Sequence, residues 1–580
     1  MAIRKPVGET MNNVCVNSEL KTKKLSMVEL SLLHPDERLY TVALLQPLQS
    51  VDATPEYVKN RDNVSARQKH QKFLNLAFEN NVDLAISPEY SCPWDVLEVA
   101  LQGDCFPQEG KLWILGCESI KLNDFFSFIH KHNEIAWIHE TPDPQAGTKF
   151  LDVVCCLFNA KNDESQSKRV ICVQLKGQAM ADHHHYIERD NLITGKNRYI
   201  FSNDENSIKL AIIICSDALS FKVTDLPAYL NTPYLIIHPQ LNPQPFQNAF
   251  RLYRQIEFVS SGERKEVFTT NWARGVQITE ELPANEFGGS AFYTKSDKLN
   301  LTDGRIDHNH TKGLYYSLCK QQYSHSYFFN YDEHVFILRV TKPSQDRAAH
   351  ALRRRTGPEM MATYQWDTQR GEWIDCPISN DGFEQIYRDI ELDISPLTDN
   401  AISPLNKERL LALSLGKVKK SRNGNWYDAD KLLSFYIGDD EAIHRATVYQ
   451  YRCEDEYNRR YEALNIFSKL KNQILNDPEY YPPCIRELAN NYMFQYPQNG
   501  YNYNICDNNN ERTATVVFMG SSAPTVAERV FDDMTSLLEE DSRSLVVWYE
   551  VGGEIKSKFK DRPLIDEDLT ENRRSITREG

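Results

Sequence analysis

The sequence lacks the cysteine patterns of disulfide-rich and zinc-binding proteins. Its 13 cysteines are odd in number and include no C-x-x-C pair, so neither a disulfide framework nor a zinc ribbon is indicated. We therefore expect the thiols to be reduced.

Long apolar segments and an excess of positive charge are also missing. No run of 18 apolar residues occurs, and the first 20 residues contain no apolar stretch of the kind found in signal peptides. The 66 Lys and Arg face 81 Asp and Glu, a formal net charge of −15, whereas surfaces that bind nucleic acid are basic. These absences predict a cytoplasmic protein without a membrane span and without nucleic acid as a partner.

The composition is otherwise that of a folded globular protein. Hydrophobic residues make up 41%, aromatic residues 11% and charged residues 25% of the chain, all ordinary values. At about 150 residues per domain, a chain of 580 residues has room for three or four domains.

Short runs rich in Val and Ile alternate with longer mixed segments over more than half of the chain. This pattern is typical of strands joined by helices in an α/β domain. Helical spacing of apolar residues occurs at 65–81 and 246–262. The predicted strands occupy residues 40–46, 82–87, 112–117, 135–140, 151–159, 170–175, 209–215, 233–239, 267–273, 289–294 and 335–340.

Changes in this pattern predict three parts of the chain. Residues 1–37 are polar and lack periodicity, so we expect an N-terminal arm or an added helix there. The strand pattern fades after Val340, which predicts a main domain at 38–345 and a C-terminal extension at 346–580.

The extension is predicted to be mainly helical with some α/β structure. Ser403 and Pro404 are typical of a helix start, with a capping serine and a proline in the first turn. Residues 513–551 read as strand, helix and strand.

Three of the predicted strands lead into a reactive side chain, namely Glu89, Lys176 and Cys215. Because α/β proteins build their sites beyond the carboxyl ends of strands, we expect a carboxylate, an ammonium and a thiol to converge at one edge. Such a trio suffices for nucleophilic attack on a carbonyl or nitrile carbon.

Each member of the trio has a physical task. Cys215 is the nucleophile, and a nearby lysine is expected to favour its thiolate. Glu89, held in a partly desolvated pocket, would take the thiol proton and pass it to departing ammonia or amine. Lys176 would stabilise the negative charge that develops on the attacked oxygen or nitrogen.

Five segments, taken in order, resemble the nitrilase superfamily of carbon–nitrogen hydrolases. The resemblance covers about residues 38–345 and implies a four-layer α-β-β-α sandwich, a catalytic triad of Glu89, Lys176 and Cys215, no metal or organic cofactor, and a homo-oligomer. The segments are SPEYSCPW at 87–94, KLAIIICSDALSF at 209–221, YLIIHPQLNPQPF at 234–246, FTTNWARG at 268–275 and FGGSAF at 287–292.

The resemblance also implies residues that contact the substrate or position the triad. A second glutamate often positions the lysine, and Glu188 is the nearest match. Asn271 and Trp272 of the FTTNWARG segment are expected at the substrate site. The chain departs from the family pattern at Ser216, where an aromatic residue is common, and in the residues that flank Lys176.

A histidine triplet, His183-His184-His185, resembles a metal site in composition. Consecutive side chains diverge along a strand or helix, and suitably spaced partners are lacking. We therefore expect a polar loop and no metal there.

Two functions from different classes fit the sequence. The first is an amidohydrolase that attacks a small non-peptide amide, in preference to a nitrile, and forms an acyl-enzyme at Cys215. Acyl transfer would use the same residues. The second is a nitrilase-fold regulatory or interaction protein, part of a larger bacterial system such as antiviral defence, whose extension at 346–580 binds a protein partner.

Overall fold

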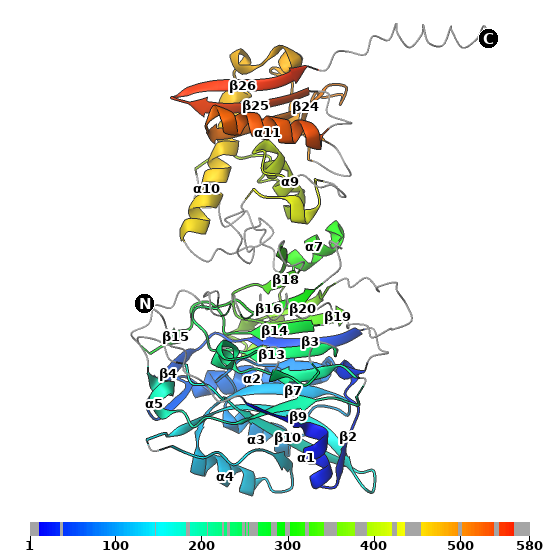
Figure 1. The fold of residues 1–580 in the computed structure, drawn as a ribbon, viewed down its shortest axis with the longest axis vertical. Helices are drawn as coiled ribbons and strands as arrows, with labels where there is room; N and C mark the ends of the chain where they lie inside the picture. The colour runs from blue at the N-terminus through cyan, green and yellow to red at the C-terminus, as the bar shows by residue number, and fades with distance from the viewer. Residues whose placement is uncertain are drawn as a thin grey trace, which may run out of the picture. The chain divides into compact units, whose positions relative to one another are not determined.

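The computed structural model divides the chain into two compact units, residues 1–379 with 439–443 and residues 380–438 with 444–580 (Figure 1). Among the described residues, no helix is long and apolar enough to cross a membrane. The structure describes residues 11–34, 39–145, 147–180, 186–205, 207–222, 225–228, 232–245, 250, 253, 265–279, 287–295, 302–319, 324–341, 357–376, 391–419, 426–434, 454–496, 502–538 and 544–561.

Two large sheets dominate the first unit. One has eight strands, in the spatial order β1 (Asn12–Cys15), β11 (Asn197–Phe201), β12 (Lys209–Ile212), β13 (Tyr234–Pro239), β14 (Lys265–Thr270), β16 (Ala291–Lys295), β18 (Ser324–Phe329) and β17 (Leu314–Cys319). The other has ten strands, in the order β21 (Glu372–Asp375), β20 (Glu359–Asp367), β19 (His334–Thr341), β3 (Leu39–Gln46), β6 (Leu84–Ile86), β7 (Leu112–Lys121), β9 (Phe150–Asn162), β10 (Ser167–Leu175) and β8 (Ala136–Ile138), with β2 (Leu25–Met27) beside β9.

Shorter elements complete the described part of this unit. A three-stranded sheet has the order β15 (Gln277–Ile278), β4 (Ser50–Thr54) and β5 (Tyr57–Asn60). The α-helices are α1 (Val16–Thr22), α2 (Asn63–Glu79), α3 (Trp94–Gln102), α4 (Leu122–Lys131), α5 (Ile187–Asn191) and α7 (Asp303–His310).

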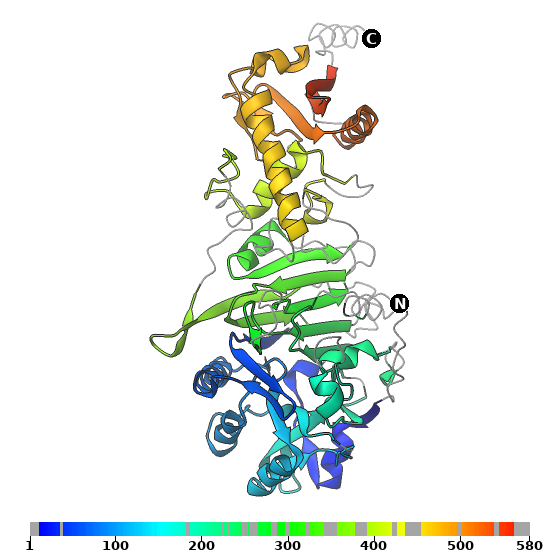
Figure 2. The ribbon, with the colours of Figure 1, turned by 90° about the vertical axis from the view of Figure 1, so that its left-hand side faces the viewer.

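Side chains of the ten-stranded sheet alternate between two buried faces. Trp113 and Leu115 of β7 pack in one cluster with residues of α2, α3 and α4. Ile114 between them points to the opposite face and is also fully buried. Strands buried on both faces read as continuous apolar runs, which is why the sequence predicted them. Figure 2 shows these helices, in blue, along the outer side of the strands.

The opposite face of the ten-stranded sheet contacts the eight-stranded sheet. The rings of Phe158 and Phe201 meet edge to face, with centroids 5.6 Å apart. The buried amide of Gln174 joins the two sheets, since its Nε2 donates to the carbonyl of Ile212 at 3.0 Å and its Oε1 accepts from the backbone of Tyr199 at 3.2 Å. Both sheets therefore contribute to one interior.

The expectation of an α/β fold is confirmed. Every strand predicted from an apolar run is present, and the helix predicted at 65–81 is α2. The helix predicted at 246–262 lies, except for two residues, outside the described residues.

Of the arm or added helix that we expected in the N-terminal segment, the helix is present as α1, and the segment also contributes two strands. Strand β1 pairs in parallel with β11, and β2 pairs with β9. Leu20 and Leu33 of this segment are fully buried. The sequence did not show these strands because β1 reads NNVC and most of its side chains are exposed.

The first unit also extends beyond the boundary that we predicted at residue 345. Strands β20 and β21 continue the ten-stranded sheet next to β19. Their side chains alternate between more and less buried positions, so they do not form the apolar runs by which the other strands were identified.

The second unit has its own sheet and helices. Within its described residues the α-helices are α9 (Pro404–Ser414), α10 (Glu454–Lys469) and α11 (Pro524–Leu537). The five-stranded sheet has the order β22 (Met493–Phe494), β23 (Ile505–Cys506), β24 (Thr513–Ser521), β25 (Ser544–Val551) and β26 (Glu554–Asp561). Ser403 caps α9 as expected, because its Oγ accepts from the backbone of Asn406 at 3.3 Å. The predicted strand, helix and strand at 513–551 are β24, α11 and β25.

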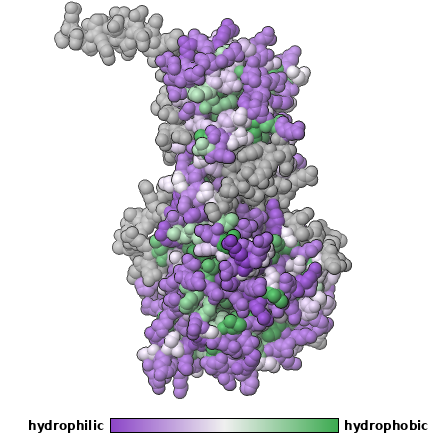
Figure 3. All heavy atoms as spheres, turned by 180° about the vertical axis from the view of Figure 1, so that it is seen from behind, coloured by the Kyte–Doolittle hydropathy of each residue, from purple (hydrophilic) through white to green (hydrophobic). Residues whose placement is uncertain are grey.

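The surface visible in Figure 3 is mainly hydrophilic, and its hydrophobic residues occur in small groups. Among the described residues, the most exposed large hydrophobic side chains are Val64, at 70%, and Val99, at 50%. Single exposed apolar residues are normal in soluble proteins. The expected homo-oligomer and protein partner therefore stay predictions.

The position of β20 and β21 predicts where the first unit can be cut. Trp373 of β21 is 7% exposed and its Nε1 donates to the carbonyl of Lys69 at 3.0 Å. A chain that ends at residue 379 should therefore unfold at least about 3 °C higher than one that ends at 345. Thermal denaturation of both fragments, with Trp373→Ala in the longer one as a control, measures this difference. Equal melting temperatures would contradict the assignment.

Candidate active site

Glu89 lies in a tight turn directly after β6. Its Oε2 accepts from the backbone N–H of Leu241 at 2.6 Å, and its backbone carbonyl accepts from Trp272 Nε1 at 2.8 Å. The side chain is 1% exposed. The next residue, Tyr90, has a positive φ of 57°, which a non-glycine residue adopts at a cost. The turn is thus held from both sides, with the carboxylate directed into the protein.

Lys176 follows β10 and is the centre of a charged cluster. Its Nζ lies 2.8 Å from Glu89 Oε1, 2.7 Å from Glu188 Oε1 and 3.6 Å from Asp152 Oδ2. The side chain of Lys176 is 1% exposed. Burial alone would lower the pKa of Lys176, but the neighbouring acidic groups, Glu188 first among them, raise it well above its usual range. The lysine is therefore a permanent cation.

Cys215 begins a short 3-10 helix, η2 (Cys215–Leu219), just after β12. Its φ is +37°, so the thiol sits at a strained strand-to-helix turn, a feature common at functional sites. The side chain is 3% exposed, and the carbonyl of Cys215 is 3.0 Å from His238 Nε2. Cys215 is within range of electrostatic interaction with Glu89 and Lys176, and those two side chains are in direct contact.

Burial and the charge of Glu89 outweigh the effect that we expected Lys176 to have on the pKa of the Cys215 thiol. Burial raises the pKa of Cys215 well above its usual range, and the charge of Glu89 adds to this increase. Lys176 opposes both effects, but its charge is already compensated by the carboxylates around it. Burial and Glu89 therefore favour the neutral thiol of Cys215, whereas Lys176 alone would favour the thiolate.

Glu188 contacts the lysine, as the resemblance implied. Both of its carboxylate oxygens accept from Lys176 Nζ, at 2.7 and 2.8 Å. The hydroxyl of Tyr90 donates to Oε1 at 2.9 Å, and the backbone N–H of Met180 donates to Oε2 at 2.7 Å. Glu188 therefore fixes the position of the ammonium.

Asn271 and Trp272 follow β14 and are fully buried. The amide of Asn271 donates to the carbonyls of Asn242 and Gly288, at 2.8 and 2.7 Å, and Trp272 supports the backbone of Glu89. In this arrangement both residues hold the loops of the site, and their contact with a substrate stays a prediction.

Two residues of the site were not found from the sequence. Asp152, near the start of β9, is 0% exposed and lies beside Lys176. Its only sequence signal is a single acidic residue within the apolar run LDVVCCLFN. The sequence assigned no task to Asp217. Its Oδ1 accepts from the backbone of Gly177 and Gln178, at 3.0 and 2.7 Å, and so holds the chain just after the lysine.

The acidic residues of the cluster could in principle bind a metal ion. Glu89, Asp152 and Glu188 each offer an oxygen, and these oxygens lie within 4.8 Å of one another, the one such group among the described residues. Lys176 Nζ, however, is within 3.6 Å of all three carboxylates, so the ammonium takes the position of a cation. The histidine triplet at 183–185 lies outside the described residues.

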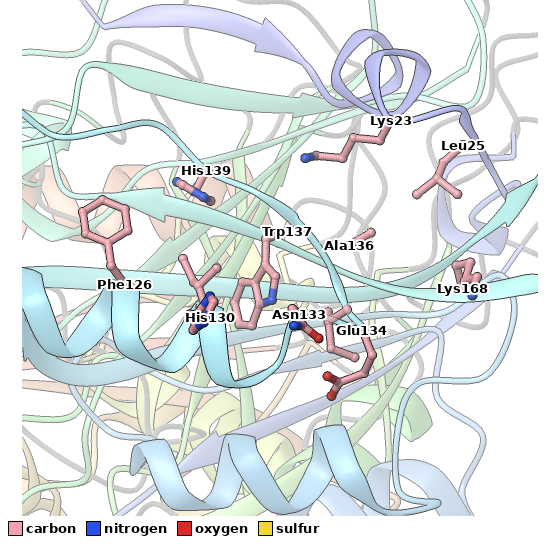
Figure 4. A pocket seen from close by; sticks show the side chains of 12 residues that line it. Lys23, Leu25, Phe126, His130, Asn133, Glu134, Ala136, Trp137, His139 and Lys168 are labelled. Atoms are coloured by element: carbon pink, nitrogen blue, oxygen red, sulfur yellow. The ribbon is translucent and has the colours of Figure 1, made fainter.

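A surface pocket of about 600 Å³ lies elsewhere in the first unit (Figure 4). Phe126, Trp137 and His139 form part of its wall, with Lys23 and Lys168 at its edge. None of Glu89, Lys176 and Cys215 lines it. The charged cluster and this pocket are therefore separate features.

Comparisons with known proteins give little guidance. No family model and no curated protein matches. Among solved structures 27 chains match, and one of them is a glutamine-dependent NAD(+) synthetase from Cytophaga hutchinsonii, with 11% sequence identity and a TM-score of 0.27 over 60% of this chain. The match spans 45% of that chain, so this protein covers less than half of its length. Such a likeness carries no argument about function.

The close approach of β7 to the glutamate turn yields a prediction about stability. A Cβ on Gly116 would lie 2.2 Å from the carbonyl oxygen of Pro88 and 2.7 Å from the Cα of Glu89. Gly116→Ala should therefore displace the turn and reduce the free energy of unfolding by about 1–3 kcal/mol, measured by denaturant titration. Gly304→Ala, in the helix α7 with open space around it, is the control and should be neutral or slightly stabilising. Equal effects of the two substitutions would show that the turn does not depend on Gly116.

Proposed function

We propose that the protein is an amidohydrolase of the nitrilase superfamily, which hydrolyses a small non-peptide amide through Cys215. The observation that carries this proposal is the buried contact of Lys176 with Glu89 and Glu188, next to a cysteine at a strained turn. Burial of a complete set of nucleophile, base and cation is costly to stability and is typical of active sites.

The first half of the reaction would form an acyl-enzyme. Because the resting thiol is neutral, Glu89 takes its proton as the sulfur attacks the carbonyl carbon. Lys176 donates a hydrogen bond to the oxygen that gains negative charge. Glu89 then returns the proton to the nitrogen, the C–N bond breaks, and ammonia or an amine leaves a thioester on Cys215.

The second half would release the acid. Glu89, again a carboxylate, takes a proton from water as the water oxygen attacks the thioester carbon. The C–S bond breaks, the proton returns to the sulfur, and the carboxylic acid departs. If another nucleophile replaced water, the same residues would carry out acyl transfer.

Other parts of the proposal rest on the resemblance. The four-layer α-β-β-α sandwich is supported by the two contacting sheets and by the helices α2, α3 and α4 on one outer face. The homo-oligomer, the cytoplasmic location and a reaction that needs no metal or organic cofactor are proposed on the same basis.

A regulatory or interaction protein is the second candidate function. The observation that favours it is the separate unit at 380–438 and 444–580, which has its own sheet and apolar clusters and exceeds what hydrolysis of a small amide requires. In that case the first unit would bind an amide-like ligand without turnover, and the second unit would bind a protein partner.

Hydrolysis by defined variants tests the proposal. The full chain is incubated with a panel of small aliphatic, aromatic and amino-acid amides and the matching nitriles, and released ammonia is measured. Cys215→Ala should abolish release, because it removes the nucleophile, and Glu89→Gln should reduce it at least about a hundredfold, because it removes the base. Cys105→Ala, a thiol outside the cluster, is the control and should be neutral.

The lysine has matched controls in the same region. Lys176→Met should reduce turnover at least about a hundredfold, whereas the exposed Lys168 and Lys196 should tolerate the same change. Undiminished turnover in Cys215→Ala or Lys176→Met would exclude the mechanism. Thermal stabilisation of the wild-type protein by an amide that it does not hydrolyse would favour the regulatory candidate.

A further inference from the structure

Asp152 is a buried acid to which the proposed reaction gives no task. It lies near the start of β9 and is 0% exposed. Its backbone carbonyl accepts from the backbone N–H of Lys176 at 3.2 Å, so β9 and the residue after β10 are fixed side by side. Among the described residues, neither oxygen of its side chain has a hydrogen-bond donor.

The surroundings of this side chain are acidic. One oxygen each of Asp152, Glu89 and Glu188 lie within 4.8 Å of one another, and Lys176 supplies a single positive charge. If all three carboxyl groups were ionised, the buried cluster would carry −3 + 1 = −2. Like charges at this separation in a buried site disfavour full ionisation.

The contacts indicate which of the three groups carries the proton. Glu188 accepts hydrogen bonds at both oxygens from Lys176, Tyr90 and Met180. Glu89 accepts from Lys176 and from the backbone of Leu241. Donors of this kind stabilise a carboxylate, and Asp152 lacks them, with Lys176 Nζ at 3.6 Å.

We propose that Asp152 is a positioning residue that stays in the neutral acid form and donates its carboxyl proton in a hydrogen bond to Glu89. One oxygen of Asp152 and one of Glu89 lie within 4.8 Å, and neighbouring buried carboxyl groups can share one proton, as in other carboxyl dyads. With this proton Asp152 can donate a hydrogen bond to Glu89. The proton also reduces the net charge of the cluster to −1.

The direction of the pKa shift agrees with this geometry. Burial and the charge of Glu89 raise the pKa of Asp152 well above its usual range, against the opposing effect of Lys176. The groups that face Asp152 are Glu89 and Tyr90 after β6, Lys176 after β10, Glu188 in α5 and Cys215 in η2. Of these, Tyr90 is neutral, because burial raises its pKa well above the usual range.

The neutral acid has a consequence for the reaction, and this part of the inference rests on the proposed function. Glu89 must keep one orientation while it takes a proton from Cys215 and returns it to the substrate. A hydrogen bond from Asp152 holds that orientation. An ionised Asp152 would instead add a negative charge near the thiol and oppose removal of its proton.

The protonation state can be tested without any substrate. Asp152→Asn keeps the shape and the donor of the neutral acid but cannot ionise. In the wild type, an acid with a raised pKa has no stability cost below its unfolded-state pKa, about 3.9. The cost grows as pH rises towards the folded-state pKa. The melting temperature of Asp152→Asn minus that of the wild type should therefore increase by at least about 3 °C between pH 5 and pH 8.

Asp83, directly before β6, provides a matched control. Its carboxylate lies 2.6 Å from Lys111 Nζ and accepts from the backbone and hydroxyl of Thr41. Asp83→Asn removes a paired charge and should lower the melting temperature at pH 7 to 8. If the difference for Asp152→Asn stays constant or falls as pH rises, Asp152 is an ionised partner of Lys176 and the proposal is overturned.

A second measurement covers the case in which Asp152→Asn fails to fold. The infrared spectrum of the wild type with ¹³C-labelled aspartate carboxyl groups, recorded at pH 8, should contain the C=O band of a protonated acid. Burial raises the pKa of Asp217 to about 7, so that group is mostly ionised at pH 8. Absence of the band would overturn the proposal.

Turnover tests the positioning role separately. At pH 7, Asp152→Asn should keep turnover within about threefold of the wild type, whereas Asp152→Ala should lose at least about tenfold, because alanine cannot donate to Glu89. The loss of turnover at alkaline pH should begin at a higher pH in Asp152→Asn than in the wild type. Equal losses of turnover in the two variants would overturn the positioning role.

Absence of turnover in the wild type would contradict the proposed function. The two measurements of protonation would then still decide whether Asp152 is neutral or ionised.

Discussion

The rest of the site depends on the contacts between the buried ammonium of Lys176 and three acidic side chains. The ammonium lies against Glu89 after β6, Asp152 in β9 and Glu188 in α5, and so ties together segments that are far apart in the sequence. Removal of one partner from a buried ion pair costs about 3–5 kcal/mol, because the remaining charge is left without compensation. The cluster therefore fixes the turns around it and also sets the electrostatic environment of Cys215.

Much of the fold could be predicted because both faces of the ten-stranded sheet are buried. Strands such as β7 then read as apolar runs, and the reactive residues that follow such runs could be expected at one edge. Strands β1, β20 and β21 were missed because polar residues interrupt their sequences, NNVC, EMMATYQWD and EWID, so that none of them forms a long apolar run. Asp152 could not be found because a single acid in an apolar run does not reveal its partners, which depend on the pairing of β9 with β10.

The protonation state of Cys215 could not be predicted from its position in the sequence. The sequence predicted a lysine close to Cys215, and a lysine in isolation would favour the thiolate. Here carboxylates surround the ammonium, and burial raises the pKa of the thiol. A neutral thiol requires a base that acts during the attack, and Glu89 interacts with both the lysine and the thiol. Under the proposed function, the carboxylates favour general-base catalysis by Glu89 over attack by a preformed thiolate.

The central claim is that this cluster makes Cys215 the nucleophile of an acyl-transfer reaction. Mass spectrometry of proteolytic peptides, after brief incubation of the full chain at pH 7 with a reactive p-nitrophenyl ester, tests this claim most directly. The account predicts an acyl group on Cys215 that appears first and disappears as the thioester is hydrolysed. It predicts no such transient adduct on the exposed Cys15 or the half-buried Cys105. Acylation of these two thiols with Cys215 unmodified would contradict the account.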